Sequence, residues 1–340
     1  MNSITETLLF PYTRGLIERP KPDSRLLFLN AENPSLLKEL TSPVLVQPRY
    51  DKARSLIEAG YKVIPARPEG KFDTAWILPG KDMTETQCLL AQTVISAKEN
   101  GIILAAAPND AGGKRLEGLF ENLCLTPHAE SKHKARVVYA SIDKNCNKEQ
   151  AGIWLAQGQE QFILNSDLVS CPGLHGWDKV DTGSALLARH LPADLRGSVA
   201  DFGCGWGYLS LQAAATSKKI TRLTLIDIDS RAIYLAEKNV RNKHPSLTVE
   251  ALWADLASPD KRLGKYDVIL MNPPFHEGTH AVPALGQALI TTAAHALKPS
   301  GSLYMVANRH LPYEKTLQAL FSRINPLADE NGFKAFDCKL

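Results

Sequence analysis

The chain has 340 residues, of which 44% are hydrophobic and 22% are charged, and its formal net charge at pH 7 is +3. Such a chain is long enough for two domains of ordinary size, and its composition is that of a folded globular protein. The near balance of acidic and basic residues excludes binding to nucleic acid through an overall excess of cations, but it leaves room for a local basic surface.

Apolar runs and cysteine spacing exclude several further classes of protein. The apolar run at 102–107 has the size of a strand, well below the about 20 residues of a membrane helix. The N-terminal MNSITETLLFPYTRG lacks the basic and long apolar regions of a signal peptide. None of the six cysteines forms a CxxC pair, which argues against a zinc or thioredoxin-like site. We therefore expect a cytoplasmic protein with reduced thiols and no membrane association.

Strand-like and helix-like segments alternate along the whole chain. In the first half, strands are predicted at 25–29, 44–46, 62–65, 73–78, 102–107 and 136–142, with helices at 51–59 and 84–98. In the second half, strands are predicted at 198–202, 221–226, 248–253, 266–271 and 302–307, with helices at 208–217, 230–243, 285–297 and 314–321. This alternation predicts an α/β fold with mainly parallel sheets covered on both faces, and ligand binding at the carboxyl ends of the strands.

The two halves also share short patterns in the same order. Lys71-Phe72-Asp73, an apolar strand and Pro79 match Lys265-Tyr266-Asp267, its strand and Pro273, and Gly101-IILAAA matches Gly301-SLYMVA. Such matches predict a duplication, although two unrelated α/β domains could share them by chance. The polar stretch at 143–150 then separates a domain at 1–145 from a domain at 150–340.

A glycine-rich loop, Asp201-Phe202-Gly203-Cys204-Gly205-Trp206-Gly207, follows the strand at 198–202. Glycines let the backbone turn sharply and approach a ligand closely. A dinucleotide loop would hold a pyrophosphate here, but Asp201 would repel a phosphate and suits an ammonium group. The segment resembles the loop of class I S-adenosylmethionine methyltransferases. That resemblance implies that Asp201, Gly203, Cys204, Gly205, Trp206 and Gly207 bind the methionine part of the cofactor.

Two further aspartates follow strands at the expected spacing. Asp227 ends the strand at 221–226, 20 residues after Gly207, and a carboxylate there can accept hydrogen bonds from both ribose hydroxyls. A helix-capping acid is the alternative, since Ser230 lies just beyond it. Asp255 follows the strand at 248–253 and could bind the adenine amino group, or it could be an ordinary loop residue.

Asn272-Pro273-Pro274-Phe275 directly follows the strand at 266–271. The prolines fix the backbone and remove competing amide donors. The Asn272 side-chain oxygen and the Pro273 carbonyl can then accept both hydrogens of a planar NH2 group, and Phe275 can stack on its base. Accepting these hydrogens favours a pyramidal, nucleophilic nitrogen without a strong general base. The sequence therefore predicts catalytic roles for these four residues, with Asn272 also beside the cofactor; a merely rigid loop is the alternative.

This motif and its surroundings resemble the ribosomal RNA guanine-N2 methyltransferases. The matching segments are Asn272-Pro-Pro-Phe-His-Glu-Gly278, Val306-Ala-Asn-Arg-His-Leu-Pro-Tyr313, the terminal Phe333-Lys-Ala-Phe, Cys171-Pro-Gly-Leu-His175 and Asp181-Thr-Gly-Ser184. The resemblance is sharp over 162–340 and architectural before it. It implies two tandem Rossmann-like methyltransferase domains, the N-terminal one degenerate and positioning RNA.

The first half has lost the residues that the resemblance makes functional. Its first strand leads into Asn30-Ala31-Glu32-Asn33-Pro34 instead of a glycine loop, and Leu78-Pro79-Gly80-Lys81 stands in place of the Asn-Pro-Pro-Phe motif. Two departures also occur in the second half. His175 stands where the family has Phe, which puts one aromatic wall of the substrate pocket in doubt, and Trp206 is large enough to reshape the mouth of the cofactor site.

The sequence therefore predicts a monomeric, S-adenosylmethionine-dependent methyltransferase that modifies the N2 amine of a guanine in 16S rRNA of the small ribosomal subunit. The alternatives are a 23S rRNA enzyme, a protein glutamine-amide methyltransferase and a non-catalytic RNA-binding factor. No metal site is expected, because no carboxylate-rich cluster surrounds His276, His280 and His310. Candidate RNA contacts are Lys132, His133, Lys134, Arg136, Arg14, Arg19, Lys21, Arg25, Lys218, Lys219 and Arg222.

Overall fold

The computed structural model describes residues 3–66, 69–163, 165–258, 260–274, 276–277, 280–281 and 283–340. The chain divides into two compact units, Met1–Gln161 with Cys171–Gly173, and Phe162–Ser170 with Leu174–Leu340. None of the helices in the described ranges has the length and hydropathy needed to cross a bilayer. The six cysteines all lie in these ranges and form no disulfide there.

Each unit contains one seven-stranded sheet. The strands of the first are β1 Leu26–Leu29, β2 Val44–Val46, β3 Val63–Ile64, β4 Phe72–Ile77, β5 Ala97–Pro108, β6 His128–Lys132 and β7 Ala135–Ser141. Those of the second are β10 Arg196–Phe202, β11 Lys219–Asp227, β12 Thr248–Trp253, β13 Tyr266–Met271, β16 Leu297–Asn308, β17 Arg323–Glu330 and β18 Phe333–Lys339. Two short pairs, β8 Gln161–Ile163 with β9 Leu168–Ser170 and β14 His276–Glu277 with β15 His280–Ala281, complete the strands of the described ranges.

The two sheets have the same topology. Their orders are β3-β2-β1-β4-β5-β7-β6 and β12-β11-β10-β13-β16-β18-β17. In each sheet the first five strands are parallel, and the sixth and seventh form a hairpin whose inner strand is antiparallel to the fifth. The predicted α/β class and the tandem pair of Rossmann-like domains are confirmed. Of the strands in these two sheets, β6, β17 and β18 were not predicted.

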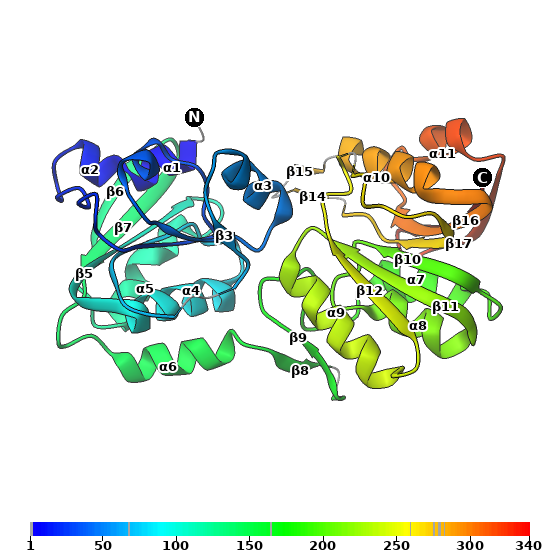
Figure 1. Cartoon of the computed structure of the whole chain (residues 1–340), viewed down its shortest axis with the longest axis horizontal. Coiled ribbons are helices and arrows are strands. Elements are labelled where there is room, and N and C mark those ends of the chain that lie inside the picture. Colours follow the sequence, from blue (N-terminus) through cyan, green and yellow to red (C-terminus); the bar gives the residue numbers. More distant parts are fainter. Residues whose placement is uncertain are drawn as a thin grey trace. The chain divides into compact units, whose positions relative to one another are not determined.

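Helices cover both faces of each sheet. The first unit contains α1 Ser3–Leu8, α2 Phe10–Thr13, α3 Tyr50–Glu58, α4 Met83–Ser96, α5 Leu116–Asn122 and α6 Lys148–Gln157. The second contains α7 Thr182–His190, α8 Tyr208–Thr216, α9 Ser230–Lys243, α10 Pro283–Ala296 and α11 Glu314–Leu320. In the second unit, α10 and α11 cover one face and α8 and α9 the other (Figure 1), each over its own hydrophobic core.

The first unit extends beyond the predicted boundary at 145–150. Helix α6 begins within that stretch, and its Trp154 and Ala151 are buried in the same hydrophobic core as Leu90 and Val94 of α4. Burial of a large aromatic side chain is worth several kcal/mol, so α6 belongs to the first unit. The polar composition of 143–150 marks a turn before this helix and not the end of the unit.

The two sheets share an aspartate–lysine ion pair at equivalent positions. Asp73 accepts a hydrogen bond from Arg25 N at 2.9 Å and pairs with Lys98 at 2.7 Å, while Asp267 accepts from Ser198 N and pairs with Lys298, both at 2.8 Å. Beside each aspartate the strand register shifts, between Phe72 and Thr74 and between Tyr266 and Val268. Shared irregularities of this kind support a duplication more strongly than shared regular elements do.

The paired aspartates make a stability prediction. Asp73→Ala and Asp267→Ala each leave a backbone N–H without its acceptor, and we expect each to lower the free energy of unfolding by about 1–2 kcal/mol. Lys98→Gln and Lys298→Gln break only half-exposed ion pairs, so they should cost less than about 1 kcal/mol. Urea denaturation of the four variants measures both effects. Equal losses for the aspartate and lysine variants would contradict this assignment.

Candidate functional site

The predicted site residues gather at one edge of the second sheet. The glycine loop follows β10, Asp227 ends β11, Asp255 follows β12 and Asn272 follows β13. Strands β11 and β13 flank β10 on opposite sides, so the direction of the strand order reverses at β10. A crevice at such a reversal is where open α/β sheets bind their ligands. Phe275 lies outside the described residues.

The glycine loop leaves open space above its backbone. Gly203 has φ +76° and Gly205 has φ +52°, and a Cβ added at either would meet no atom within 4 Å. The loop is held from beneath, because the N–H groups of Gly203 and Cys204 donate to Ile226 O at 2.8 and 3.1 Å. A ligand can therefore approach the main chain of a loop whose shape is already fixed.

Asp201 is 1% exposed and caps the helix that follows the loop. Its Oδ2 accepts hydrogen bonds from Ser210 N at 3.1 Å and from Ser210 Oγ at 2.6 Å, which replaces the side-chain cap that Gly207 cannot supply to α8. Its Oδ1 is buried and has no hydrogen-bond partner within the described part of the chain. Burial raises the pKa of Asp201 to about 6, against the hydrogen bonds from Ser210 that lower it.

Asp227 connects the glycine loop to the end of β11. Its Oδ2 accepts from Gly205 N and its Oδ1 from Asp229 N, both at 2.9 Å. A carboxylate oxygen has two acceptor positions, so each oxygen keeps one for a further donor. Burial raises the pKa of Asp227 to about 6, although the backbone amides of Asp229, Gly205 and Ile228 oppose the shift.

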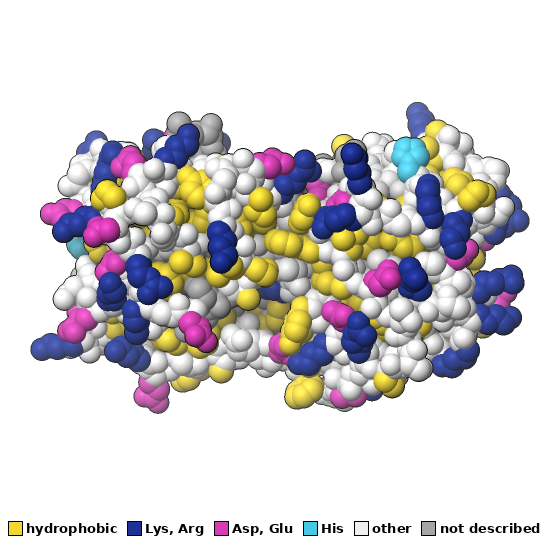
Figure 2. Space-filling model, in the orientation of Figure 1, with side chains coloured by type: hydrophobic (Ala, Val, Ile, Leu, Met, Phe, Trp, Pro, Cys, Tyr) yellow, Lys and Arg dark blue, Asp and Glu magenta, His cyan; other side chains and the backbone are white. Residues whose placement is uncertain are grey.

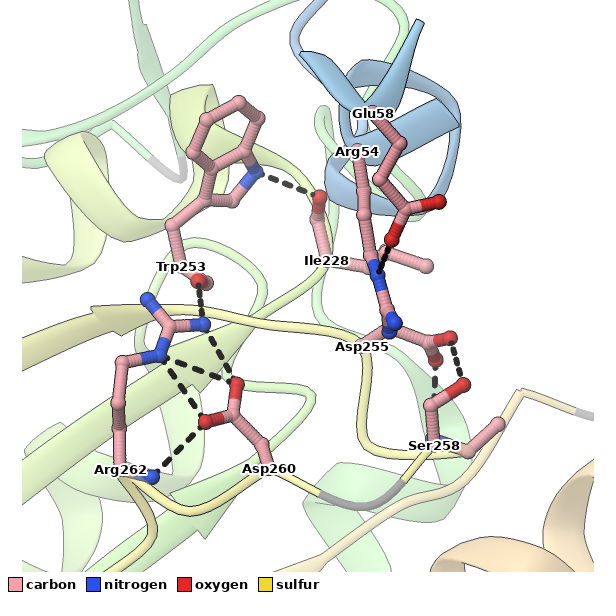
Figure 3. A network of polar contacts seen from close by, with 9 residues as sticks. Arg54, Glu58, Ile228, Trp253, Asp255, Ser258, Asp260 and Arg262 are labelled. Atoms are coloured by element: carbon pink, nitrogen blue, oxygen red, sulfur yellow. Dashed lines mark hydrogen bonds and ion pairs between the residues drawn. The ribbon is translucent and has the colours of Figure 1, made fainter. Parts of the chain in front are cut away.

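Asp255 holds the turn that follows β12 (Figure 3). Its Oδ1 accepts from Ala257 N at 2.9 Å and its Oδ2 from Ser258 Oγ at 2.8 Å. Nearby, Trp253 Nε1 donates to Ile228 O at 2.8 Å and joins the ends of β12 and β11 (Figure 3). Asp255 therefore has a structural role in this turn, whatever ligand it also meets.

Cys204 and Trp206 point into the protein. The thiol of Cys204 is buried, and burial raises its pKa well above the usual range, so it is not a nucleophile at neutral pH. Trp206 is 5% exposed within a hydrophobic core and donates from Nε1 to Gly176 O at 3.1 Å. The expectation that its bulk reshapes the mouth of the loop is not supported, because the indole lies in the core.

Two side chains at the start of α7, far from Asn272 in the sequence, fix the amide of Asn272. Its Nδ2 donates to Asp181 Oδ2 at 2.7 Å and to Ser184 Oγ at 2.8 Å. Both N–H groups are thereby used, and Oδ1 accepts no hydrogen bond among the described residues. The following Pro273 is buried and has no N–H. The arrangement presents an oriented acceptor beside a backbone that cannot compete for it.

The sequence pointed to Asp181 and Ser184 only as part of a motif and gave them no role. Asp181 is the N-cap of α7, where its Oδ2 also accepts from Ser184 N at 2.8 Å. An Asp three residues before a Ser at a helix start is a capping signal, but its hydrogen bond to Asn272 spans 91 residues. Only the fold brings these groups together.

His175, the departure from the family's Phe, lies next to this cluster. Its Nε2 is 3.9 Å from Asp181 Oδ1, and its side chain is 81% exposed. The imidazole, with the hydrogen bonds from Ser184 N and Asn272, lowers the pKa of Asp181 to about 2 despite partial burial. Asp181 in turn raises the pKa of His175. His175 therefore places a titratable imidazole at a position where the resembling proteins have Phe.

The same positions of the first unit carry different chemistry. The matched strand registers place Phe28 at the position of Asp201, Gln47 at that of Asp227 and Leu78 at that of Asn272. Gln47 is 1% exposed; its Nε2 donates to Ala31 O at 2.8 Å and its Oε1 accepts from Arg49 N at 3.0 Å. Both ends of the Gln47 side-chain amide are thus used in hydrogen bonds to the backbone of the first unit. At the matching position, each carboxylate oxygen of Asp227 keeps an acceptor position for a ligand.

The predicted RNA-contact residues are spread over both units, and the histidines considered as metal ligands form no metal cluster among the described residues. Within the described residues no group of three or more His, Cys, Asp or Glu side chains could hold a metal ion, and the side chains of His276 and His280 lie outside them. On the face drawn in Figure 2, Lys and Arg side chains are scattered among Asp and Glu over both units. Arg222, one of the RNA candidates, pairs with Glu250 at 3.3 Å.

Comparisons with known proteins agree with this geometry. The family described as "Methyltransferase small domain" matches residues 165–337. This chain is 29% identical over 273 residues to a protein of Psychromonas ingrahamii named ribosomal RNA small subunit methyltransferase C. The match covers 79% of this chain and 76% of the relative. The one from Cronobacter sakazakii is 28% identical over 293 residues, covering 86% and 82%.

Among solved structures, the 16S rRNA N2 G1207 methyltransferase of T. thermophilus, solved with AdoMet and guanosine, has a TM-score of 0.79 and 22% identity. The similarity covers 99% of this chain and 91% of that one. It shows that both units together, and not the second alone, share their fold with that protein.

The His175–Asp181 pair makes a prediction about pH. We expect the imidazole of His175 to titrate above its ordinary pKa of about 6.5 and to return toward it in Asp181→Asn. The raised pKa of His175 stabilises the folded protein fully below about pH 6.5, and this contribution is lost as the pH rises above the pKa of the folded state. The lowered pKa of Asp181 stabilises the folded protein above about pH 4, and this contribution is lost as the pH falls. NMR titration of the imidazole in the wild-type protein and in Asp181→Asn measures the shift. An unshifted His175 in the wild-type protein would contradict the pair.

Proposed function

The chain belongs to the methyltransferase small domain family, and from this premise we propose that it methylates the exocyclic N2 amine of a guanine in 16S rRNA of the small ribosomal subunit. S-adenosylmethionine is the methyl donor. The names of the relatives, which are small-subunit rRNA methyltransferases, support this substrate over 23S rRNA. The observation that carries the proposal is the fixed orientation of the Asn272 amide.

The residues after β10 and β11 fit the cofactor. The open space above Gly203 and Gly205 is a cradle that any side chain would fill. The buried, unpartnered Oδ1 of Asp201 suits an ammonium donor, and Asp227 keeps one acceptor position on each oxygen for the two ribose hydroxyls. Asp255 has the same spare capacity for the adenine amine. When bound, S-adenosylmethionine supplies an electrophilic methyl carbon.

Asn272 and Pro273 act on the guanine amine. With both N–H groups of Asn272 held by Asp181 and Ser184, only Oδ1 can face the substrate, and it accepts one amine hydrogen. The Pro273 carbonyl accepts the other. The two hydrogen bonds hold the amine hydrogens out of the plane of the base, which favours a pyramidal and more nucleophilic nitrogen. The amine is thus oriented and polarised without a strong general base. Phe275 stacks on a base that has left its helix.

The two units divide the work in this proposal. The first has Phe28, Gln47 and Leu78 at the positions of the cofactor and amine ligands, so it contributes to positioning RNA and not to catalysis. The enzyme works in the cytoplasm as a monomer. The absence of disulfides among its six cysteines is compatible with that compartment.

Methyl transfer to purified ribosomal subunits tests the proposal. The wild-type protein should transfer label from S-adenosylmethionine to small subunits and yield N2-methylguanosine in nucleoside mass spectrometry. Asn272→Ala should lower kcat by about 10²–10³ with little change in cofactor affinity, because it removes an oriented acceptor from the reacting amine. Asn325→Ala, an exposed change in the same unit, is the control.

Each other outcome rejects the proposal in a definite way. Label in large subunits selects a 23S enzyme, and label only in protein selects a glutamine-amide methyltransferase. Cofactor binding without transfer to any of these substrates selects a non-catalytic RNA-binding factor.

Gly205→Ala tests the cofactor cradle separately. The added Cβ enters space that is empty in the protein but faces the proposed ligand, so we expect the affinity for S-adenosylmethionine to fall at least tenfold in calorimetry. The strain of a positive φ should cost only about 1–2 kcal/mol of stability. Gly15→Ala, at φ +67° with equally open surroundings in the first unit, is the matched control. It should show the same loss of stability and unchanged cofactor affinity; equal affinities of the two variants would argue against the cradle.

A further inference from the structure

The hairpin of β6 and β7 turns through two residues in an unfavourable conformation. His133 has φ +51° and Lys134 has φ +57°, and Lys132 pairs with Ala135 on either side of them. Two positive φ angles in a two-residue turn are typical of the type I′ hairpin, which favours Asn-Gly, Asp-Gly or Gly-Gly. A lysine with a Cβ is strained in this conformation.

The duplicated fold contains the same turn with the favoured residues. In the second unit β17 and β18 are joined by Asn331 at φ +51° and Gly332 at φ +82°, between the pair Glu330 and Phe333. Both hairpins occupy the same place in their sheets. Since this topology is built elsewhere in the same chain from Asn-Gly, the fold does not explain His133 and Lys134. Strained residues of this kind point to a function of their side chains.

The charge around the two turns differs. Lys132, His133 and Lys134 form the first turn, and the Arg14 guanidinium lies 5.9 Å from the centre of the Phe10 ring, with Lys132 Nζ at 5.4 Å from the same ring. The second turn follows Asp329 and Glu330, whose carboxylates pair with Arg309 and Arg189, so the charges are balanced there. The basic character therefore belongs to the unit that lacks the methyl-transfer residues.

The base of the first turn is rigidly attached. Thr7 Oγ1 donates to Lys132 O at 3.0 Å, and the Glu6 carboxylate lies 2.9 Å from His133 Nε2 and 3.5 Å from Lys132 Nζ. Lys134 is exposed at the tip, and no ion pair involves it within the described residues. These contacts hold the turn firmly while leaving one ammonium group available.

The turn also lies at the ligand-binding edge of its sheet. Strand β7 begins opposite Pro108, the last residue of β5. The carboxyl end of β5 corresponds to that of β16, on the edge where the second unit carries its glycine loop and Asn272. A substrate guided along this edge of the first sheet would meet the turn.

We propose that the basic turn, made of Phe10, Arg14, Lys132, His133 and Lys134, is a docking site for the phosphodiester backbone of RNA. The inference rests on the proposed RNA substrate and identifies where the first unit holds it. Lysine and arginine contact phosphates as charges and carry no base specificity. The site therefore contributes affinity and register, and the choice of guanine stays with the second unit.

The double variant His133→Asn/Lys134→Gly gives the first turn the residues of the second. Because it relieves the positive φ strain, we expect its Tm to rise by a few degrees. We also expect its affinity for a small-subunit rRNA transcript to fall by about fivefold to tenfold, with the slope of log K against log salt reduced by about one. Affinity for S-adenosylmethionine should not change. Lys315→Gln, an exposed lysine on α11 of the second unit, is the control.

The outcomes separate docking from a structural role. A higher Tm with unchanged RNA affinity and salt slope, or a loss no larger than that of Lys315→Gln, would overturn the proposal. The single variant Lys134→Asn, which removes the charge but tolerates the turn, must show the same loss in affinity. Since the binding assay involves no methyl transfer, a wild-type protein that binds the transcript but transfers no methyl group contradicts the proposed function and leaves the docking comparison intact.

Discussion

The hydrogen bonds from the Asn272 amide to Asp181 and Ser184 are the constraint on which the candidate site depends. An amide side chain has a donor end and an acceptor end of nearly the same shape, and only its partners decide which end faces a substrate. Here both donors are taken by groups at the start of α7. The cap of a helix thus decides the chemistry of a loop 91 residues further along the chain.

The neighbouring contacts keep this constraint in place. Trp206 joins the glycine loop to Gly176, in the segment leading to α7. Asn239, 2% exposed, donates to Trp206 O and exchanges two hydrogen bonds with the backbone of Val169. The glycine loop, the segment before α7 and the helix α9 are therefore joined by one polar network beneath the candidate site. Buried networks with every member satisfied are rigid, and a rigid base suits catalysis by orientation.

Much of the architecture could be predicted from the sequence, because it depends on local patterns. Alternating strands and helices, the glycine loop and the aspartate after the second strand all leave a signal within a few residues. The role of Asp181 could not be predicted, since its partner is distant in sequence, and neither could the burial of Trp206, whose loop position suggested exposure. The boundary was misplaced because the polar stretch at 143–150 resembles a linker, whereas Trp154 anchors the next helix to the first core.

A comparison of the two units shows how one residue of the candidate site affects the stability of the fold. At one strand position the first unit has Phe28, fully buried among apolar side chains. The second unit has Asp201, equally buried, with one oxygen that has no hydrogen-bond partner among the described residues. An unpaired buried carboxylate oxygen destabilises a core by about 1–3 kcal/mol relative to a satisfied one, and burial raises its pKa to about 6. A buried phenylalanine at this position avoids that cost and stabilises the core. In the proposed function the ammonium group of the cofactor satisfies that oxygen, because a cation is the partner that such a carboxylate binds best.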